Sequence, residues 1–377
     1  MTNSQYFEPD ICNIDEFSEI INRKTDAATV PNASDIQSQV PIYDTATLDL
    51  DRTVMAEWAN VLMQGAGIVI LKNAYTDTTV IDAATKVFES IILAERGSDK
   101  ADHFAASGAN DRLWNSLEKL CLAAPDVFLR YFANPVIAAI SEAWLGPNYQ
   151  MTAQVNLVHP GGAAQQAHCD YHLGFQSADV SCSYPAHVHA LSPALTLQGA
   201  IAHCDMPVES GPTKLLPFSQ TYLAGYAAWR RDDFRTLFED RCIQLPLSKG
   251  DALFFNPALF HGAGANSSTD IHRMANLLQV SSVFGRAMET IDRRGMSKAL
   301  YPIAVAAKTQ FSSTEMAAAI GSCAEGYAFP TNLDRDSPIR GIAPETQAAF
   351  FSRALAEGMH QLAFEATLDA MADRKLS

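Results

Sequence analysis

The stretch from about residue 150 to residue 283 constrains the fold more than any other part of the chain. Short runs of β-branched and aromatic residues alternate there with clusters of Gly, Pro and Ser. This texture predicts several short strands joined by turns, as in an antiparallel sandwich or barrel. The predicted strands cover residues 152–158, 195–202, 242–247, 252–256 and 273–283. We therefore expect a β core in the middle of the chain.

Helical patterns flank this core on both sides. A helix is predicted from Asp51 to about Gly65, because Val54, Trp58 and Val61 recur on one face. A buried strand at 67–72 and a second helix starting near residue 77 follow, and residues 113–145 are helical again. Beyond residue 286 helix returns, ending in one long segment over 344–372 whose Pro344 suits a first helical turn.

These patterns predict one functional domain. Residues 1–45 are polar and poorly periodic, so we expect an irregular, partly ordered N-terminal arm. Residues 46–377 then form the domain, with its β core at about 150–285 and a helical C-terminal extension at about 286–377. The predicted fold class is mainly β with flanking α, with helices contributed from both ends of the chain.

Composition excludes several classes of partner. The formal net charge is −15 over 377 residues and no basic stripe is visible, so we expect no nucleic-acid binding. No apolar run is long enough to span a bilayer, and the first residues lack the features of a signal peptide. The seven cysteines form no CxxC pair, which favours a reducing compartment. A cytoplasmic location follows as an expectation.

A His-x-Asp pair offers the first metal ligands. In an extended strand the side chains of residues i and i+2 lie on the same face, so His168 and Asp170 can point at one ion while Cys169 points away. One imidazole and one carboxylate suit Fe(II), and a second imidazole would complete one face of an octahedron and leave three positions open.

A second histidine and an arginine follow at suitable places. An apolar strand at 253–255 leads to His261, which lies on a Gly-rich turn where the backbone can approach a ligand closely. Arg273 opens the next strand, and its guanidinium could bind a carboxylate through two parallel hydrogen bonds. The alternative for Arg273 is a surface ion pair with a carboxylate such as Asp270.

The ordered set His168-x-Asp170, His261 and Arg273 resembles the phytanoyl-CoA dioxygenase family of Fe(II)- and 2-oxoglutarate-dependent oxygenases. The resemblance extends over roughly residues 65–285. Matching features are the strand at 65–72, the turn at 160–162, the central strand and acidic turn at 197–213, and the strand at 250–255. Arg273 lies one residue later than the family pattern, which implies one extra residue in the preceding turn. Asp170 is present, whereas related halogenating enzymes have a small residue at that position.

The resemblance implies a double-stranded β-helix core of the jelly-roll, cupin-like type. It implies Fe(II) held by His168, Asp170 and His261, with 2-oxoglutarate as co-substrate and Arg273 on its distal carboxylate. Gln154 and Asn156, on the strand before the metal motif, are further candidates for contact with the co-substrate. The expected reaction is hydroxylation of a C–H bond of a small-molecule metabolite by molecular oxygen, with release of succinate and carbon dioxide. The resemblance leaves the primary substrate and the oligomeric state open.

Other histidines compete with this set. His172 would share the face of Asp170 if the strand continued, as a substrate contact or a hydrogen-bond donor to a ligand. His187 and His189 are expected to be solvent-accessible loop residues, and His203 to be a packed or substrate-facing residue of the central strand.

Two other functions stay open on the sequence. The first is a catalytically silent jelly-roll that acts as a binding protein, and the second is a cupin-type metal oxygenase that does not use 2-oxoglutarate. Titration with Fe(II) and 2-oxoglutarate, and oxygen consumption without the keto acid, would separate these from the dioxygenase.

Overall fold

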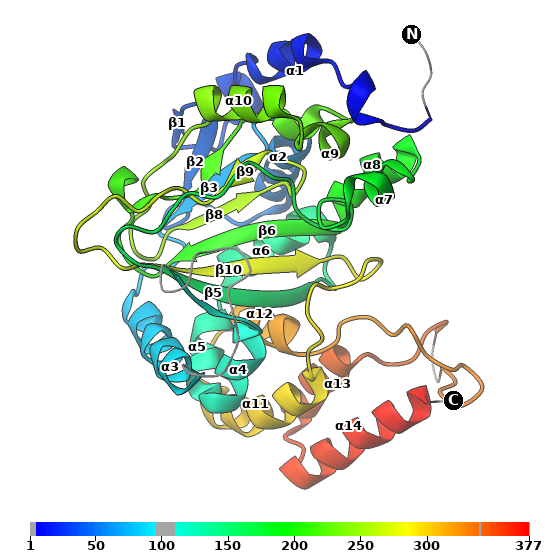
Figure 1. The fold of residues 1–377 in the computed structure, drawn as a ribbon. Coiled ribbons are helices and arrows are strands. Elements are labelled where there is room, and N and C mark those ends of the chain that lie inside the picture. The colour runs from blue at the N-terminus through cyan, green and yellow to red at the C-terminus, as the bar shows by residue number, and fades with distance from the viewer. Residues whose placement is uncertain (1–4, 96–109, 339–340, 377) are drawn as a thin grey trace.

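The fold is a large β-sheet with helices packed on one face and a smaller sheet opposite the other (Figure 1). The structure, a computed structural model, describes residues 5–95, 110–338 and 341–376. Within these residues eight strands form the large sheet in the order β1-β2-β3-β8-β6-β10-β5-β4, and β7 pairs with β9 in the small sheet. All pairings are antiparallel except that of β2 with β3.

The strands are short except for two at the centre of the large sheet. Their bounds are β1 (Asp35–Gln37), β2 (Val40–Asp44), β3 (Ile68–Lys72), β4 (Asn110–Leu113), β5 (Gln150–Val158), β6 (Thr196–Ala202), β7 (Lys214–Leu215), β8 (Ala252–Phe255), β9 (His261–Gly262) and β10 (Arg273–Ser281). The fully paired β5 and β10 carry the residues that shape the site, and β10 also pairs with β6.

Helices cover the apolar face of the large sheet. Those packed there are α2 (Arg52–Met63), α3 (Thr79–Glu95), α4 (Ser116–Ala123), α5 (Pro125–Phe132), α6 (Pro135–Leu145), α11 (Arg293–Ala307), α12 (Ser313–Cys323), α13 (Gln347–Glu357) and α14 (Gln361–Lys375). The remaining helices are α1 (Ile14–Ile21), α7 (Ala178–Cys182), α8 (Ala186–Leu191), α9 (Gly225–Ala228) and α10 (Asp232–Arg241). In Figure 1 the latter lie in the upper half of the view, away from α11, α13 and α14 at the bottom.

Strict alternation along the central strands separates the core from the site. On β5, Met151, Ala153 and Val155 enter the large apolar core beneath the helices. Their neighbours Gln154 and Asn156 point the opposite way and line a cavity. This follows from the two-residue period of a strand. Burial of the apolar face therefore fixes which residues of β5 face the cavity.

The N-terminal residues differ from the expected irregular arm. The described part of residues 1–45 contains α1 and the strands β1 and β2, and β2 pairs in parallel with β3 through Ile42 and Ile70. Buried Glu57 of α2 anchors this segment by accepting hydrogen bonds from the Tyr43 hydroxyl (2.9 Å) and the Asn32 amide (2.7 Å). The prediction of irregularity is wrong there, because these long-range contacts order a segment whose polar composition by itself does not predict secondary structure.

Two further expectations of secondary structure are wrong. Residues 242–247 do not form a strand, because Ile243 and Leu247 pair only through isolated bridges with Leu215 and Met206. The long C-terminal helix is two helices that separate at Gly358, whose φ of 67° favours glycine. The first of the two begins at Gln347 after the capping side chain of Thr346, so Pro344 precedes the helix.

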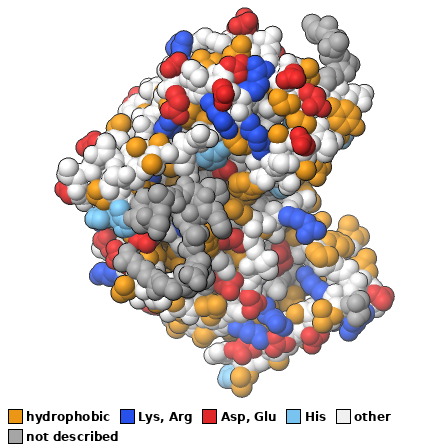
Figure 2. All heavy atoms as spheres, in the orientation of Figure 1, with side chains coloured by type: hydrophobic (Ala, Val, Ile, Leu, Met, Phe, Trp, Pro, Cys, Tyr) orange, Lys and Arg blue, Asp and Glu red, His pale blue; other side chains and the backbone are white. Residues whose placement is uncertain are grey.

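The predicted fold class, a β core with flanking helices, is confirmed. No helix of the described residues is both long enough and apolar enough to cross a membrane. All seven cysteines lie in the described residues and are free thiols. On the face drawn in Figure 2, Lys and Arg side chains lie among Asp and Glu side chains.

Candidate metal centre

A cavity lies against the polar face of the large sheet and contains the predicted ligands. Its walls come from β5, β6, β8 and β10, from the segment at 165–170, and from His261 of β9. Apolar side chains such as Leu253, Phe255 and Trp114 alternate in its lining with amides and with Arg273. A mostly apolar cavity with a few convergent polar groups is typical of a small-molecule site.

The two histidines are held together through their backbones. The amide of His168 donates to the carbonyl of His261 (2.9 Å), and the amide of His261 donates to the carbonyl of His168 (3.0 Å). Their rings lie with centroids 4.4 Å apart. The pair therefore forms an antiparallel bridge that fixes the spacing of both side chains.

Each ring presents the same nitrogen to the centre. Nδ1 of His168 donates to the carbonyl of Gln166, and Nδ1 of His261 donates to the carbonyl of Leu259, both at 2.8 Å. A carbonyl oxygen only accepts hydrogen bonds, so the Nδ1 atom that faces it must carry the ring proton. Nε2 of each neutral ring is then left with its lone pair. Burial lowers the pKa of His168, which favours the neutral form that a metal needs.

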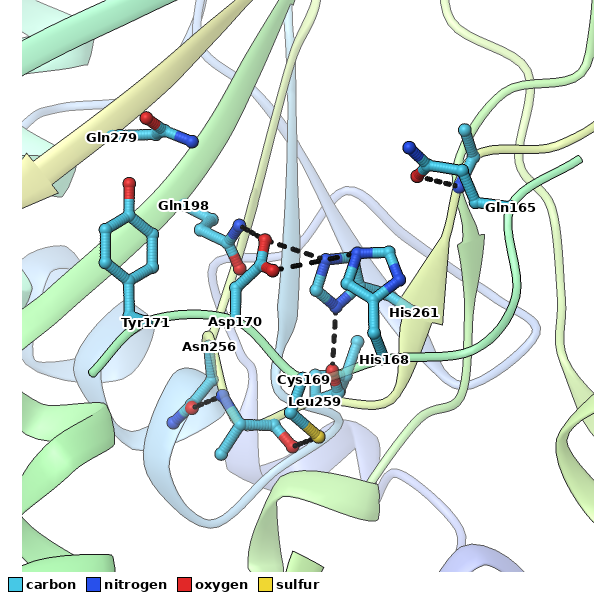
Figure 3. A network of polar contacts seen from close by, with 12 residues as sticks. Gln165, His168, Cys169, Asp170, Tyr171, Gln198, Asn256, Leu259, His261 and Gln279 are labelled. Atoms are coloured by element: carbon cyan, nitrogen blue, oxygen red, sulfur yellow. Dashed lines mark hydrogen bonds and ion pairs between the residues drawn. The ribbon is translucent and has the colours of Figure 1, made fainter. Parts of the chain in front are cut away.

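Asp170 faces both lone pairs. Its Oδ1 lies 3.7 Å from Nε2 of His168, and its Oδ2 lies 3.4 Å from Nε2 of His261 (Figure 3). Burial by itself raises the pKa of the Asp170 carboxyl, but in the absence of a metal the two imidazoles, when protonated at Nε2, and a hydrogen bond from Gln198 outweigh it and hold that pKa at about 2. The carboxylate is therefore ionised at neutral pH.

The three side chains fit a metal of the expected kind. One ligand atom from each of His168, Asp170 and His261 lies within 4.8 Å of the other two. Two imidazole nitrogens and one carboxylate oxygen form the donor set typical of non-haem Fe(II) oxygenases. Cys169, between two of the ligands, points away as expected, since its thiol donates to the carbonyl of Ala258 (3.2 Å) (Figure 3).

The segment carrying His168 and Asp170 is not the extended strand that we expected. Only His168 forms a β-bridge, and the chain turns at Tyr171 and His172, whose φ angles are 56° and 40°. His172 therefore leaves the face of Asp170 and lines a different cavity beside Leu191 and other residues of α8. The condition on which His172 would share the face of Asp170, a continuing strand, is therefore not met.

Arg273 lies in the same cavity as the three ligands. It opens β10, is 6% exposed, and its Nη1 donates to the carbonyls of Ser210 (3.1 Å) and Gly264 (3.4 Å). Burial lowers its pKa to about 10, which still leaves the guanidinium charged at neutral pH. In the described part of the chain it makes no ion pair with Asp270 or any other carboxylate. Arg273 is thus a buried cation facing a cavity.

Gln154 and Asn156 both line the cavity, as neighbours on its β5 wall. The Gln154 side chain is already engaged by Arg112 and Gln279. Oδ1 of Asn156 is buried and has no hydrogen-bond partner among the residues that the structure describes. Their contact with a co-substrate stays a prediction.

The three other histidines weighed in the sequence, His187, His189 and His203, lie outside this cavity. His203 is packed beneath the helices as expected, between the hydroxyls of Thr85 and Tyr131. His189 is 1% exposed within α8 and bonds the carbonyl of Ser181, so the expectation of a solvent-accessible loop residue is wrong for it. His187 of the same helix is exposed.

Sequence reasoning missed several polar residues of the cavity, three of which lie on the sheet wall. Gln198 of β6 donates to Oδ2 of Asp170, while Gln279 of β10 and Arg112 of β4 lie farther along the same wall. The alternation of β6 and β10 could have placed both glutamines on the polar face. Their proximity to the ligands depends on the strand order, which the sequence does not display.

Comparison with known proteins agrees with this geometry. Residues 63–275, more than half of the chain, match the family described as phytanoyl-CoA dioxygenase (PhyH). Dioxygenase trt7 of Aspergillus terreus is 21% identical over 221 residues, which cover 59% of this chain and 72% of that protein. Dioxygenase andF of Emericella variicolor is 22% identical over 238 residues, covering 61% and 73%. The solved structure of the non-haem α-ketoglutarate-dependent epimerase SnoN from nogalamycin biosynthesis aligns with a TM-score of 0.41 at 20% identity, over 62% of this chain and 84% of that one.

The fold and the site define a non-haem iron oxygenase. The chain belongs to the phytanoyl-CoA dioxygenase family. It is an Fe(II)- and 2-oxoglutarate-dependent dioxygenase.

Proposed function

We propose that His168, Asp170 and His261 bind the Fe(II) and that the enzyme hydroxylates a C–H bond of a small-molecule metabolite. The observation that carries the proposal is the convergence of three ligand atoms within 4.8 Å in a cavity that also contains the buried cation Arg273. Bound Fe(II) supplies the activation of molecular oxygen, coupled to decarboxylation of 2-oxoglutarate.

Arg273 positions the co-substrate in this proposal. Its guanidinium would pair with the distal carboxylate of 2-oxoglutarate, because the planar group can donate two parallel hydrogen bonds to the two carboxylate oxygens. Burial strengthens the attraction between the two charges. The carbonyls of Ser210 and Gly264 hold the guanidinium in place. Keto acids without a second carboxylate would leave it unpaired, so they are expected to bind weakly.

The apolar lining protects the reaction from water. Leu253, Phe255 and Trp114 surround the polar groups, and a substrate that fills the remaining space would displace solvent. The balanced reaction is one substrate C–H, one O₂ and one 2-oxoglutarate giving one C–OH, one succinate and one carbon dioxide. One oxygen atom enters the product and the other enters succinate.

Gln154 and Asn156 are proposed to contribute to the co-substrate wall. Asn156 lines the cavity and offers the two hydrogens of its amide nitrogen and an oxygen that is unpartnered within the described part of the chain. Asn156→Leu is expected to raise the KM for 2-oxoglutarate and to leave the dissociation constant of Fe(II) unchanged.

A substrate screen tests the proposed function. Small-molecule metabolites are incubated with the protein, Fe(II), 2-oxoglutarate and oxygen, and succinate and hydroxylated product are quantified, with His261→Ala as the blank. The expected result is succinate equal to product for at least one metabolite and none in the blank. A product lacking an oxygen atom from O₂ would overturn hydroxylation, and succinate formation by the blank would overturn the metal site.

A further inference from the structure

The aromatic ring of Phe175 stands at the mouth of the cavity that contains the metal ligands. The ring lines this cavity and is nevertheless 48% exposed. In the described part of the chain, no other exposed large apolar side chain belongs to the cavity wall. Single exposed apolar side chains are ordinary on protein surfaces, so exposure alone indicates nothing. Phe175 differs because it lies on the boundary between the cavity and solvent.

A tight turn directly after the ligand Asp170 places this ring. The amide of Gly174 donates to the carbonyl of Tyr171 (2.8 Å). A Cβ on Gly174 would lie 2.1 Å from the carbonyl oxygen of Cys169, so the backbone can approach itself this closely only at a glycine. The turn brings the ring of Phe175 back against that of Tyr171, with the two centroids 5.4 Å apart.

Arg230 holds the same turn through its backbone. The guanidinium donates to the carbonyls of Gly174 (3.2 Å) and Gln176, which flank Phe175 on either side. It also lies over the ring of Trp229, 4.1 Å from the centroid. The backbone of Phe175 is therefore fixed before a ligand arrives, and binding to a surface that is already ordered costs less entropy.

A thioether continues this apolar surface along the cavity wall. Met288 lines the cavity, and its sulfur accepts hydrogen bonds from the Tyr171 hydroxyl (3.4 Å) and from Nε2 of Gln154 (3.5 Å). Buried Tyr171 thus connects Phe175, through its ring, to Met288, through its hydroxyl. A methionine side chain is flexible and polarisable, so it adapts to hydrocarbon groups of different shape. We call Phe175 and Met288 the mouth wall.

The co-substrate does not match the mouth wall. 2-Oxoglutarate is short and carries a charged carboxylate at each end, so its expected partners are the metal and the cation Arg273. An apolar surface contributes to binding when a hydrocarbon group removes it from water. A charged group placed there would lose hydration without gaining a partner. The mouth wall therefore suits the other molecule that must enter the cavity.

We propose that Phe175 and Met288 bind a hydrocarbon part of the primary substrate, which is therefore a hydrophobic molecule that extends to the mouth of the cavity. This inference rests on the proposed function in taking the cavity as the site of that substrate. It narrows the small-molecule metabolite to a hydrophobic one and makes Phe175 a determinant of specificity.

Three alcohols test the mouth wall before the substrate is identified. 1-Butanol and 1-hexanol differ by two methylenes, and 1,6-hexanediol has the chain of 1-hexanol with a second polar end. Their dissociation constants are measured by ligand-observed saturation-transfer NMR on the full chain with Fe(II) and 2-oxoglutarate, without oxygen. The place of binding is read from fluorine NMR of protein that contains 4-fluorophenylalanine. The signals of Phe175 and Phe284 are assigned by their loss in Phe175→Leu and Phe284→Leu.

We expect 1-hexanol to bind roughly 5- to 15-fold more tightly than 1-butanol, because each buried methylene tightens binding about 4-fold. 1,6-Hexanediol should bind no more tightly than 1-butanol. 1-Hexanol should shift the fluorine signal of Phe175 but not that of Phe284, which is 77% exposed and lies outside the cavity. Phe175→Ala and Met288→Gln should each reduce the gain from the longer chain to below about 3-fold. Phe284→Ala, the matched control, should retain the full gain.

Three results would overturn the proposal. The first is equal affinity for 1-butanol and 1-hexanol. The second is a gain that persists in Phe175→Ala, as expected if the chain binds in the separate cavity beside Leu191. The third is an equal shift of the Phe175 and Phe284 signals, which would indicate adsorption to the surface in general. Because the measurement needs no turnover, the mouth wall can fail while the substrate screen yields succinate, and it can hold while the screen yields none.

Discussion

His168 and His261 exchange two backbone hydrogen bonds, of 2.9 and 3.0 Å, although they lie far apart in the sequence. Main-chain atoms rather than a bound ion set the distance between the two imidazoles. The carbonyls of Gln166 and Leu259 set the direction of each ring by accepting from Nδ1. The site is thus preorganised, and loss of metal is expected to leave the bridge between the two histidines in place.

The first prediction concerns the metal. His261→Ala removes one of three ligands while sparing the bridge, so we expect Fe(II) binding to weaken by more than the roughly 10- to 100-fold seen when a partner of a ligand is lost. Anaerobic titration of the Fe(II)–2-oxoglutarate charge-transfer band measures it. His187→Ala, an exposed histidine of α8, is the control and should behave as wild type. Unchanged Fe(II) affinity of His261→Ala would contradict the assignment.

The second prediction concerns the co-substrate. Arg273→Lys keeps the positive charge but loses the planar pair of donors and the hold by the carbonyls of Ser210 and Gly264. The KM for 2-oxoglutarate should rise by roughly 10- to 100-fold, while Fe(II) affinity stays the same. Initial rates of succinate formation over a range of 2-oxoglutarate concentrations measure the change. If Arg241→Lys on α10 raised the KM equally, the effect would not be specific to Arg273, and its role on the co-substrate would be contradicted.

A third prediction isolates the loop beside Arg273. Gly211 has φ +73°, and a Cβ there would lie 2.2 Å from the carbonyl oxygen of Ala265. Gly358 has a similar φ of +67°, and no atom of the described residues lies within 4 Å of the added Cβ. Gly358→Ala should therefore show only the left-handed strain of about 1–2 kcal/mol, and Gly211→Ala should lose more in urea unfolding and also raise the KM for 2-oxoglutarate. Equal losses of unfolding free energy would contradict the clash.

A fourth prediction concerns pH and stability. Burial lowers the pKa of His203 to about 3, against about 6.5 in an unfolded chain. Thr85 donates to the carbonyl of Ile81 and so accepts from Nδ1 of His203, while Nε2 accepts from Tyr131, which fixes the neutral ring. Below about pH 6.5 the unfolded state gains a proton that the folded state does not. The free energy of unfolding should therefore fall toward pH 3, by up to ~1.4 kcal/mol per pH unit.

His203→Gln removes this titration while keeping an amide for the two hydroxyl partners. Urea unfolding of the variant between pH 4 and pH 6.5 should show a shallower fall than that of the wild type. Because other groups titrate equally in both proteins, only the difference between the two slopes is informative. Parallel slopes would show that His203 takes up a proton without unfolding.

The ligand set was predictable because its signals are local. His168 and Asp170 are separated by one residue, and His261 and Arg273 each stand beside a recognisable strand. The strands β5, β6, β8 and β10 could also be placed, since buried central strands are rich in β-branched and aromatic residues. The predicted reason for the proximity of Asp170 to His168 was nevertheless wrong, because an irregular loop rather than an extended strand brings the two side chains together.

Features that depend on pairing between distant segments were not predictable. The sequence of residues 242–247 alternates like a strand, yet it finds only single bridges with Leu215 and Met206. His189 looks polar and accessible, yet a ring contact with Phe7 and the carbonyl of Ser181 bury it. The placement of Gln154, Gln279 and Gln198 on one wall of the cavity likewise depends on the order of β5, β10 and β6 in the folded sheet.

The parallel pairing of β2 with β3 has a practical consequence for anyone who shortens the chain. A fragment starting after residue 45 would lose β1 and β2 and leave β3 with a row of unpaired amides and carbonyls beside the apolar side chains of Ile68 and Ile70. Such an uncovered edge invites pairing with other molecules. Recombinant material trimmed to the apparent domain boundary should therefore aggregate, and crystallisation or screening work should retain β1 and β2.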